Sequence, residues 1–142
     1  MPFDSTDFKL DTVVDINTKT GKLNHLIKIL QSVPPNRFNM KSWRCGTSAC
    51  AAGWAGMDYT FNRMGFFSHD ATSELDELCY CSPEGKQFKY FQACEQFFEL
   101  NEWEAEYLFY PNVYSNNSEP ITPQRVISRI QSLLEGQLNY AI

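Results

Sequence analysis

Hydrophobic residues recur at helical spacing in three stretches of the chain. The first, TGKLNHLIKILQSV, is apolar at positions 23, 26, 27, 30 and 33, which together form one face of a helix. Thr18 or Thr20 offers an N-cap for this helix, and Pro34 and Pro35 end it. His25 lies beside the apolar face without an acid, a cysteine or a second histidine one turn away. We therefore interpret it as a residue at the edge of the core.

The other two stretches lie in the C-terminal half. KQFKYFQACEQFFEL repeats phenylalanine every three to four positions and predicts one helix. Asn101 and Glu104 then have the spacing of a capping box, which predicts a short helix. Thr122 followed by Pro123 is a strong helix start, and we expect Gly136 to end the amphipathic helix that follows.

The remaining segments carry weaker patterns. Residues 1–18 form a polar arm that we expect to be extended. We expect a helix over 48–57, a loop with strand character over 58–70, and a short helix over 74–78 before a turn. Residues 112–121 form a polar loop. The sum predicts a mainly α fold: a compact single domain of five or six helices with aromatic-rich loops and room for one short strand pair.

Composition narrows the possible partners. Aromatic residues make up 15% of the 142 positions, charged residues make up 20%, and the formal net charge is -5. These values favour a packed core over a disordered chain, and the acidic balance disfavours nucleic acid and anionic membranes. Residues 91–111 could form a helix-turn-helix, but the second helix carries three glutamates and no basic residue. A recognition helix that faces phosphates is not expected to have that composition.

The expected location follows from the chain start and the cysteines. MPFDSTDFKLDTVVD does not resemble a signal peptide, and no apolar run is long enough to span a membrane. The five cysteines are an odd number, which is typical of free thiols in a reducing compartment. We therefore expect a cytoplasmic protein with no membrane partner and no cofactor. The sequence leaves its oligomeric state open.

The stretch SWRCGTSACAAGWAG combines two cysteines with a helix that has almost no side chains. Its glycine gives a backbone break, its threonine offers an N-cap, and its alanines predict a helix at the centre of the fold. We expect the phenylalanines of the second stretch, Trp43 and Trp103 to pack against this helix. In this favoured interpretation both cysteines are small buried residues. The structural motif consists of Trp43, Cys45, Gly46, Thr47, Cys50, Gly53 and Trp54.

Two chemical interpretations of the cysteines stay open. Cys50 falls near the start of a helix, where free N–H groups lower the pKa of a thiol, and His69 is the one histidine after it. This pair could serve a cysteine-dependent hydrolase or transferase. Alternatively, Cys79 and Cys81 could form half of a zinc site, with His69 or Cys94 as a further ligand. Neither spacing matches a recognised nucleophile or zinc pattern.

The stretch FNMKSWRCGTSACAAGWA also resembles a motif of small bacteriophage and bacterial proteins. In that motif an Asn-Met pair and a Trp precede CGT-x-AC, which is followed by GWA or GHA. The likeness is close over residues 38–56 and looser over 91–135. It implies a shared fold and no particular activity. This chain departs from the pattern at Ser48, Ala51 and Ala52, where bulkier apolar residues are common.

These observations favour a non-enzymatic interaction protein, of the kind that a phage encodes to modulate or inhibit a host protein. Small size and many aromatic residues support a protein as the partner. The acids Asp70, Glu74, Asp76 and Glu77 are the candidate partner-facing charges. On a predicted helix they would equally suit a solvent-exposed first turn.

Overall fold

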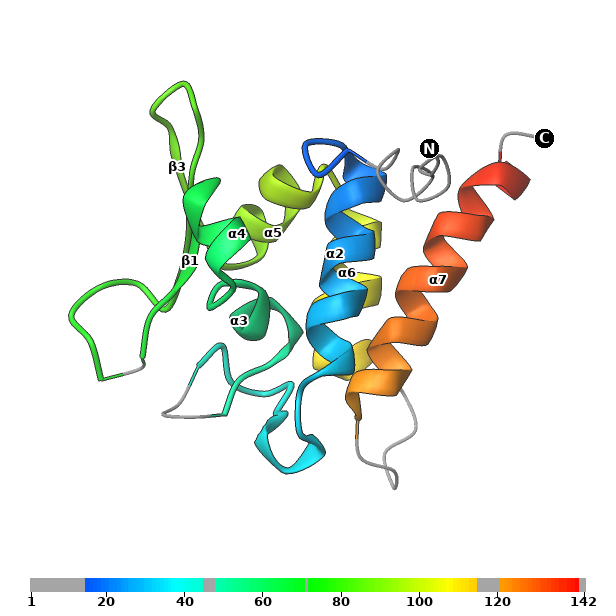
Figure 1. The fold of residues 1–142 in the computed structure, drawn as a ribbon, viewed down its shortest axis with the longest axis horizontal. Helices are drawn as coiled ribbons and strands as arrows, with labels where there is room; N and C mark the ends of the chain where they lie inside the picture. Colours follow the sequence, from blue (N-terminus) through cyan, green and yellow to red (C-terminus); the bar gives the residue numbers. More distant parts are fainter. Residues whose placement is uncertain (1–14, 45–47, 71, 115–120, 141–142) are drawn as a thin grey trace, which may run out of the picture.

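The computed structural model describes residues 15–44, 48–70, 72–114 and 121–140, except the side chains of 137–140. Its elements are α2 (Lys19–Gln31), a 3-10 turn (Pro35–Arg37), α3 (Ala51–Ala55), α4 (Tyr59–Arg63), β1 (Phe66–Ser68), β2 (Leu78–Cys81), β3 (Gln87–Lys89), α5 (Tyr90–Phe98), α6 (Glu102–Phe109), a second 3-10 turn (Pro111–Val113) and α7 (Pro123–Tyr140). Figure 1 shows α2 and α7 side by side with α6 behind α2, and the strands at the opposite end of the molecule.

The helices with clear capping signals form as predicted. Thr18 caps α2 by accepting a hydrogen bond from the N–H of Gly21 at 3.0 Å. Asn101 and Glu104 form the capping box of α6. The helix that follows Thr122 and Pro123 does not end at Gly136, as we expected, but continues to position 140. One glycine weakens a helix by only about 1 kcal/mol, so it does not stop a helix by itself.

The prediction of a mainly α fold with one short strand pair is wrong, because a three-stranded antiparallel sheet makes this an α+β fold. The predicted helix over 74–78 is a loop that leads into β2. The N-terminal part of the predicted helix over 86–100 is β3, which passes directly into α5. These strands are three or four residues long, too short for a period of two to stand out.

Each strand directs alternate side chains to α5 and to the outer face. Register places Phe66, Tyr80 and Phe88 on the face towards α5. There Phe97 of α5 stacks on Phe66 with ring centroids 4.6 Å apart, and it contacts Tyr80 edge to face at 5.2 Å. The sheet is thereby anchored to the helical part through an aromatic core.

The nearly side-chain-free helix lies inside this core. Ala51, Ala52 and Ala55 of α3 are fully buried, as are Phe61 and Phe97. The helix begins at residue 51 and not at residue 48 as expected, because the backbone before it is extended and bridges residue 38. Small residues on α3 and large rings around it therefore fill the centre together.

The segment predicted to be a loop over 58–70 contains the helix α4 as well as β1. Asp58 caps α4, accepting a hydrogen bond from the N–H of Phe61 at 3.1 Å. The same carboxylate contacts Nε2 of His25 at 2.9 Å. His25 does lie at the edge of the core, but its partner comes from 33 residues away, where a search along one helix could not find it.

Candidate functional site

Cys50 lies at the start of α3, but its surroundings are those of a buried thiol. Its side chain is 3% exposed, and its sulfur accepts a hydrogen bond from the N–H of Gly53 at 3.4 Å. Burial raises the pKa of this thiol to about 11, which keeps it protonated at neutral pH and weakens it as a nucleophile. The other motif residues Cys45, Gly46 and Thr47 lie outside the described residues.

His69, the base proposed for Cys50, contacts a different cysteine. Its Nε2 lies 3.9 Å from Sγ of Cys79, and its ring stacks on Phe67 with centroids 6.2 Å apart. Among the described residues, the pocket beside Cys50 has no histidine in its lining. The structure therefore does not bring the proposed Cys50–His69 pair together.

The proposed zinc ligands Cys79 and Cys81 occupy the outer face of β2. Partial burial raises the pKa of the Cys79 thiol, and the nearby Cys81 and Asp76 raise it further through charge repulsion. Cys94 is fully buried in α5. Within the described part of the chain, no three His, Cys, Asp or Glu side chains converge as a metal site.

The four acids expected to face a partner lie in and beside the loop between β1 and β2, not on a helix. Asp70 accepts a hydrogen bond from a backbone N–H two residues further on, at 3.1 Å. Asp76 forms an ion pair with Lys89 at 3.2 Å. Glu74 is exposed and Glu77 is half-buried. Two of the four carboxylates thus already take part in the local structure of the sheet and its loop.

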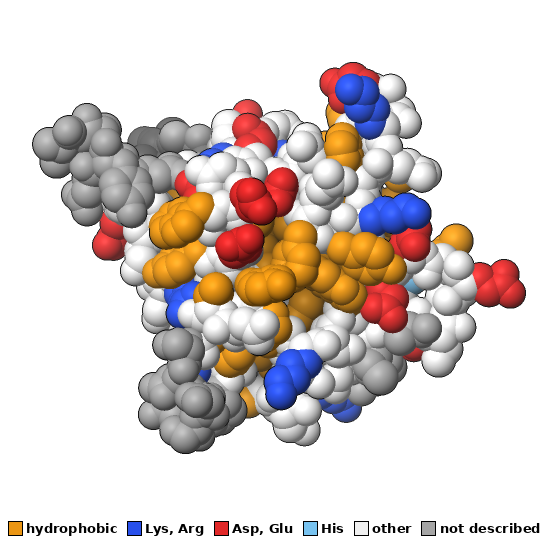
Figure 2. All heavy atoms as spheres, turned by 180° about the vertical axis from the view of Figure 1, so that it is seen from behind, with side chains coloured by type: hydrophobic (Ala, Val, Ile, Leu, Met, Phe, Trp, Pro, Cys, Tyr) orange, Lys and Arg blue, Asp and Glu red, His pale blue; other side chains and the backbone are white. Residues whose placement is uncertain are grey.

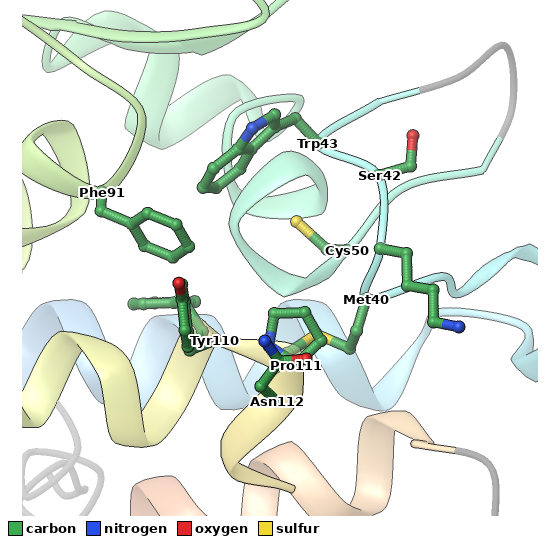
Figure 3. Close-up of a pocket in the computed structure, with 10 residues that line it drawn as sticks. Met40, Ser42, Trp43, Cys50, Phe91, Tyr110, Pro111 and Asn112 are labelled. Carbon is green, nitrogen blue, oxygen red and sulfur yellow. The ribbon is translucent and has the colours of Figure 1, made fainter.

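A pocket of about 280 Å³ opens beside Cys50, and sequence reasoning did not identify it. Three aromatic rings that are not fully buried line it: Trp43 from the loop before α3, Phe91 from the first turn of α5, and Tyr110 from the end of α6. Phe91 packs edge to face against both others, with centroids 4.9 Å from Trp43 and 5.0 Å from Tyr110. Figure 3 shows these rings around a common space into which the Cys50 sulfur points. The remaining lining residues are Met40, Lys41, Ser42, Phe109, Pro111 and Asn112.

The backbone is constrained next to two lining residues of this pocket, Trp43 and Phe91. The chain at Trp43 lies so close to Gly53 that a methyl group added to Gly53 would overlap the Trp43 carbonyl oxygen. On the other side, Tyr90 joins β3 to α5 with a left-handed φ of 56°, and its ring lies 5.6 Å from that of Trp43. Such a backbone is costly for a residue with a side chain and persists only where the surrounding structure holds it.

The solvent-facing side of α6 adds further aromatic surface. Trp103 was expected in the core, yet it is 52% exposed and stacks on Tyr107 with centroids 5.3 Å apart. The reason is helical spacing: Glu104, Ala105 and Leu108 occupy the inner side. Trp103 and Tyr107 border a second hollow of about 270 Å³ between α6 and α7. Figure 2 shows hydrophobic side chains in two groups on this side of the molecule, with acidic side chains between and beside them.

The chain matches no protein-family model, no curated protein and no solved structure in three comparisons. The likeness to small bacteriophage and bacterial proteins therefore stays a prediction. Of the helices that the structure describes, none has both the length and the apolar character needed to cross a membrane.

Proposed function

We propose that this protein is a non-enzymatic interaction protein that binds another protein through one aromatic face. We define the aromatic face as the rings of Trp43, Phe91, Trp103, Tyr107 and Tyr110. The observation that carries the proposal is the exposure of large rings beside two hollows, with Trp103 52% and Tyr110 37% exposed. Tryptophan and tyrosine are enriched at protein interfaces, and they supply most of the binding energy in many of them.

The packing of the rings supports the same proposal. The ring of Phe91 contacts those of Trp43 and Tyr110. The ring of Trp103 lies parallel to that of Tyr107 at an interplanar angle of 6°. A ring that is already held by its neighbours loses little conformational entropy when a partner covers it. A rigid aromatic surface is therefore better suited to binding than an equal number of freely rotating side chains.

The cysteine-dependent hydrolase or transferase is less well supported. Its nucleophile, Cys50, is buried with a raised pKa, and its proposed base contacts Cys79. An interaction protein is therefore the better proposal. We further propose that the chain is phage-encoded and modulates or inhibits a host protein in the bacterial cytoplasm.

Affinity capture with matched variants tests this proposal. The tagged full chain is incubated with a bacterial extract, next to Trp103→Ala, Tyr110→Ala and the control Tyr59→Ala. Tyr59 is 71% exposed on α4, so its loss removes an aromatic ring from a surface outside the aromatic face. We expect one stoichiometric partner that wild type and Tyr59→Ala retain and the other variants lose, with unchanged circular dichroism. A partner retained equally by all four proteins, or by none, would refute the proposal.

A further inference from the structure

The outer side of α6 is acidic as well as aromatic. Glu102 and Glu106 lie one turn apart on α6, and both are exposed. Neither forms an ion pair with another described residue. Glu104, on the inner side, is instead paired with Lys19 at 3.0 Å. The whole segment 90–114 contains five glutamates and no lysine or arginine, so its own net charge is negative.

Among the described residues, basic side chains close to this surface form no ion pair with Glu102 or Glu106. Arg129 of α7 lies over the ring of Tyr107, but its guanidinium donates hydrogen bonds to the carbonyl oxygens of Tyr107 at 2.8 Å and Val113 at 2.9 Å. Lys41 lines the aromatic pocket together with Tyr110. The exposed carboxylates of α6 therefore remain available to a cationic partner.

Apolar and acidic residues alternate along this side of α6. Trp103, Glu106 and Tyr110 are three and four residues apart, which places them on one side of a helix. The N–H of Tyr110 still donates to the carbonyl of Glu106 at 3.0 Å, so the helical turn extends to Tyr110. Seven residues at the helical rise separate the two rings by about 10 Å along the axis. Along the helix, Glu106 lies between them.

Each of these rings borders a hollow that can hold an apolar side chain. Tyr110 borders the pocket of about 280 Å³, and Trp103 borders the hollow of about 270 Å³ between α6 and α7. The surface thus presents two apolar hollows with negative charge between them. A second helix that lies along α6 has the same rise per residue, so its side chains at positions i and i+7 match this spacing.

We propose that the partner segment is a basic amphipathic helix. Its two apolar side chains, seven residues apart, enter the hollows beside Tyr110 and Trp103, and its lysine or arginine side chains pair with Glu102 and Glu106. This inference rests on the function proposed above. It adds the chemical class and the conformation of the segment that binds.

The three tryptophans of the chain provide the readout. The full protein, labelled with 5-fluorotryptophan, is titrated by ¹⁹F NMR with a synthetic helical peptide that carries leucines at i and i+7 and lysines between them. We expect the signals of Trp43 and Trp103 to shift. The signal of Trp54, whose indole N–H donates to the Arg37 carbonyl at 3.1 Å, should stay in place as an internal control. Shifts at all three tryptophans, or at neither Trp43 nor Trp103, would overturn the inference.

Matched peptides and variants test the charge requirement. A peptide with glutamates in place of the lysines should bind at least about tenfold more weakly, as should the original peptide in about 500 mM instead of about 50 mM salt. Glu102→Gln combined with Glu106→Gln should weaken binding similarly at low salt. Glu74→Gln with Glu84→Gln, two exposed acids elsewhere, should not. Equal binding of the acidic peptide, or equal effects of the two double variants, would contradict the proposal.

The two proposals can fail separately. If Trp103→Ala abolishes capture of a cellular partner while the basic peptide neither binds nor competes, this inference is wrong and the interaction function stands. If the wild-type protein captures no partner, the interaction function itself is wrong.

Discussion

Replacing Gly53 with alanine should destabilise this protein, although the same change stabilises most helices. Alanine has a higher helix propensity than glycine by about 1 kcal/mol. At Gly53, however, the added methyl group would overlap the carbonyl oxygen of Trp43 and lie 2.8 Å from Cβ of Ala49. The overlap involves backbone, so no change of rotamer relieves it.

The size of the effect follows from what must move. To admit the methyl group, the chain at Trp43 has to separate from α3, which strains the adjacent hydrogen bond from the Cys50 N–H to the Ser42 carbonyl at 2.8 Å. Overpacking of a close-packed core costs about 1 to 3 kcal/mol, and a lost hydrogen bond costs about 1 kcal/mol. After the gain in helix propensity is subtracted, we expect Gly53→Ala to lower the free energy of unfolding by about 1 to 3 kcal/mol.

Urea denaturation, followed by circular dichroism, measures this difference. The matched control is Gly136→Ala in α7, where an added Cβ meets nothing within 4 Å. Here we expect a gain of about 0.5 to 1 kcal/mol, which is the ordinary helix-propensity effect. If Gly53→Ala is as stable as wild type, or gains as much as Gly136→Ala, the close approach of Trp43 to α3 is wrong.

Three further predictions concern Cys50, Asp58 and Lys22. Burial raises the pKa of Cys50 in the folded state from 9.0 to about 11. The stabilising contribution of this thiol is therefore present below pH 9 and is lost as the pH rises to 11. Over that range the free energy of unfolding falls by up to ~1.4 kcal/mol per pH unit. Urea titrations across this range should show a shallower pH dependence for Cys50→Ala, and an unchanged slope would contradict this. Asp58→Ala should cost about 1 to 2 kcal/mol in thermal melts, and Asp58→Asn less because its amide oxygen can still cap α4; equal losses would disprove the capping role. Lys22→Met should cost about 1 to 3 kcal/mol, because Nζ of Lys22 donates to the carbonyl of Phe97 at 2.7 Å; unchanged stability in urea would show that this bond contributes nothing.

Local signals explain which elements could be predicted. Each helix that was predicted correctly has apolar residues at the helical period and a capping side chain that bonds to the N–H three residues on. The capping residues are Thr18 for α2, Asn101 for α6 and Thr122 for α7. The sheet consists of consecutive strands that pair as antiparallel hairpins, and each strand is too short to reveal alternation. At Tyr90 the chain passes from β3 into α5 without a linker, so the phenylalanine spacing resembles a single helix.

The sequence likewise indicates only some residues of the candidate site. The sequence singled out Trp43 and Cys50 through the composition around them, and both line the aromatic pocket. Phe91 and Tyr110 complete the pocket only after α5 and α6 fold against the loop that carries Trp43. The expectation that Trp103 packs in the core is wrong, because the buried Ala105 sets the inner side of α6 and leaves Trp103 facing outwards.

The structural motif and the proposed binding face meet at Trp43. Its carbonyl oxygen lies against Gly53 of α3, and its ring forms a wall of the aromatic pocket beside Phe91. A larger residue at Gly53 would push the backbone of Trp43 outwards and displace the ring with it. The lack of side chains on α3 therefore has a consequence at the surface: it holds Trp43 deep enough for its ring to line a pocket.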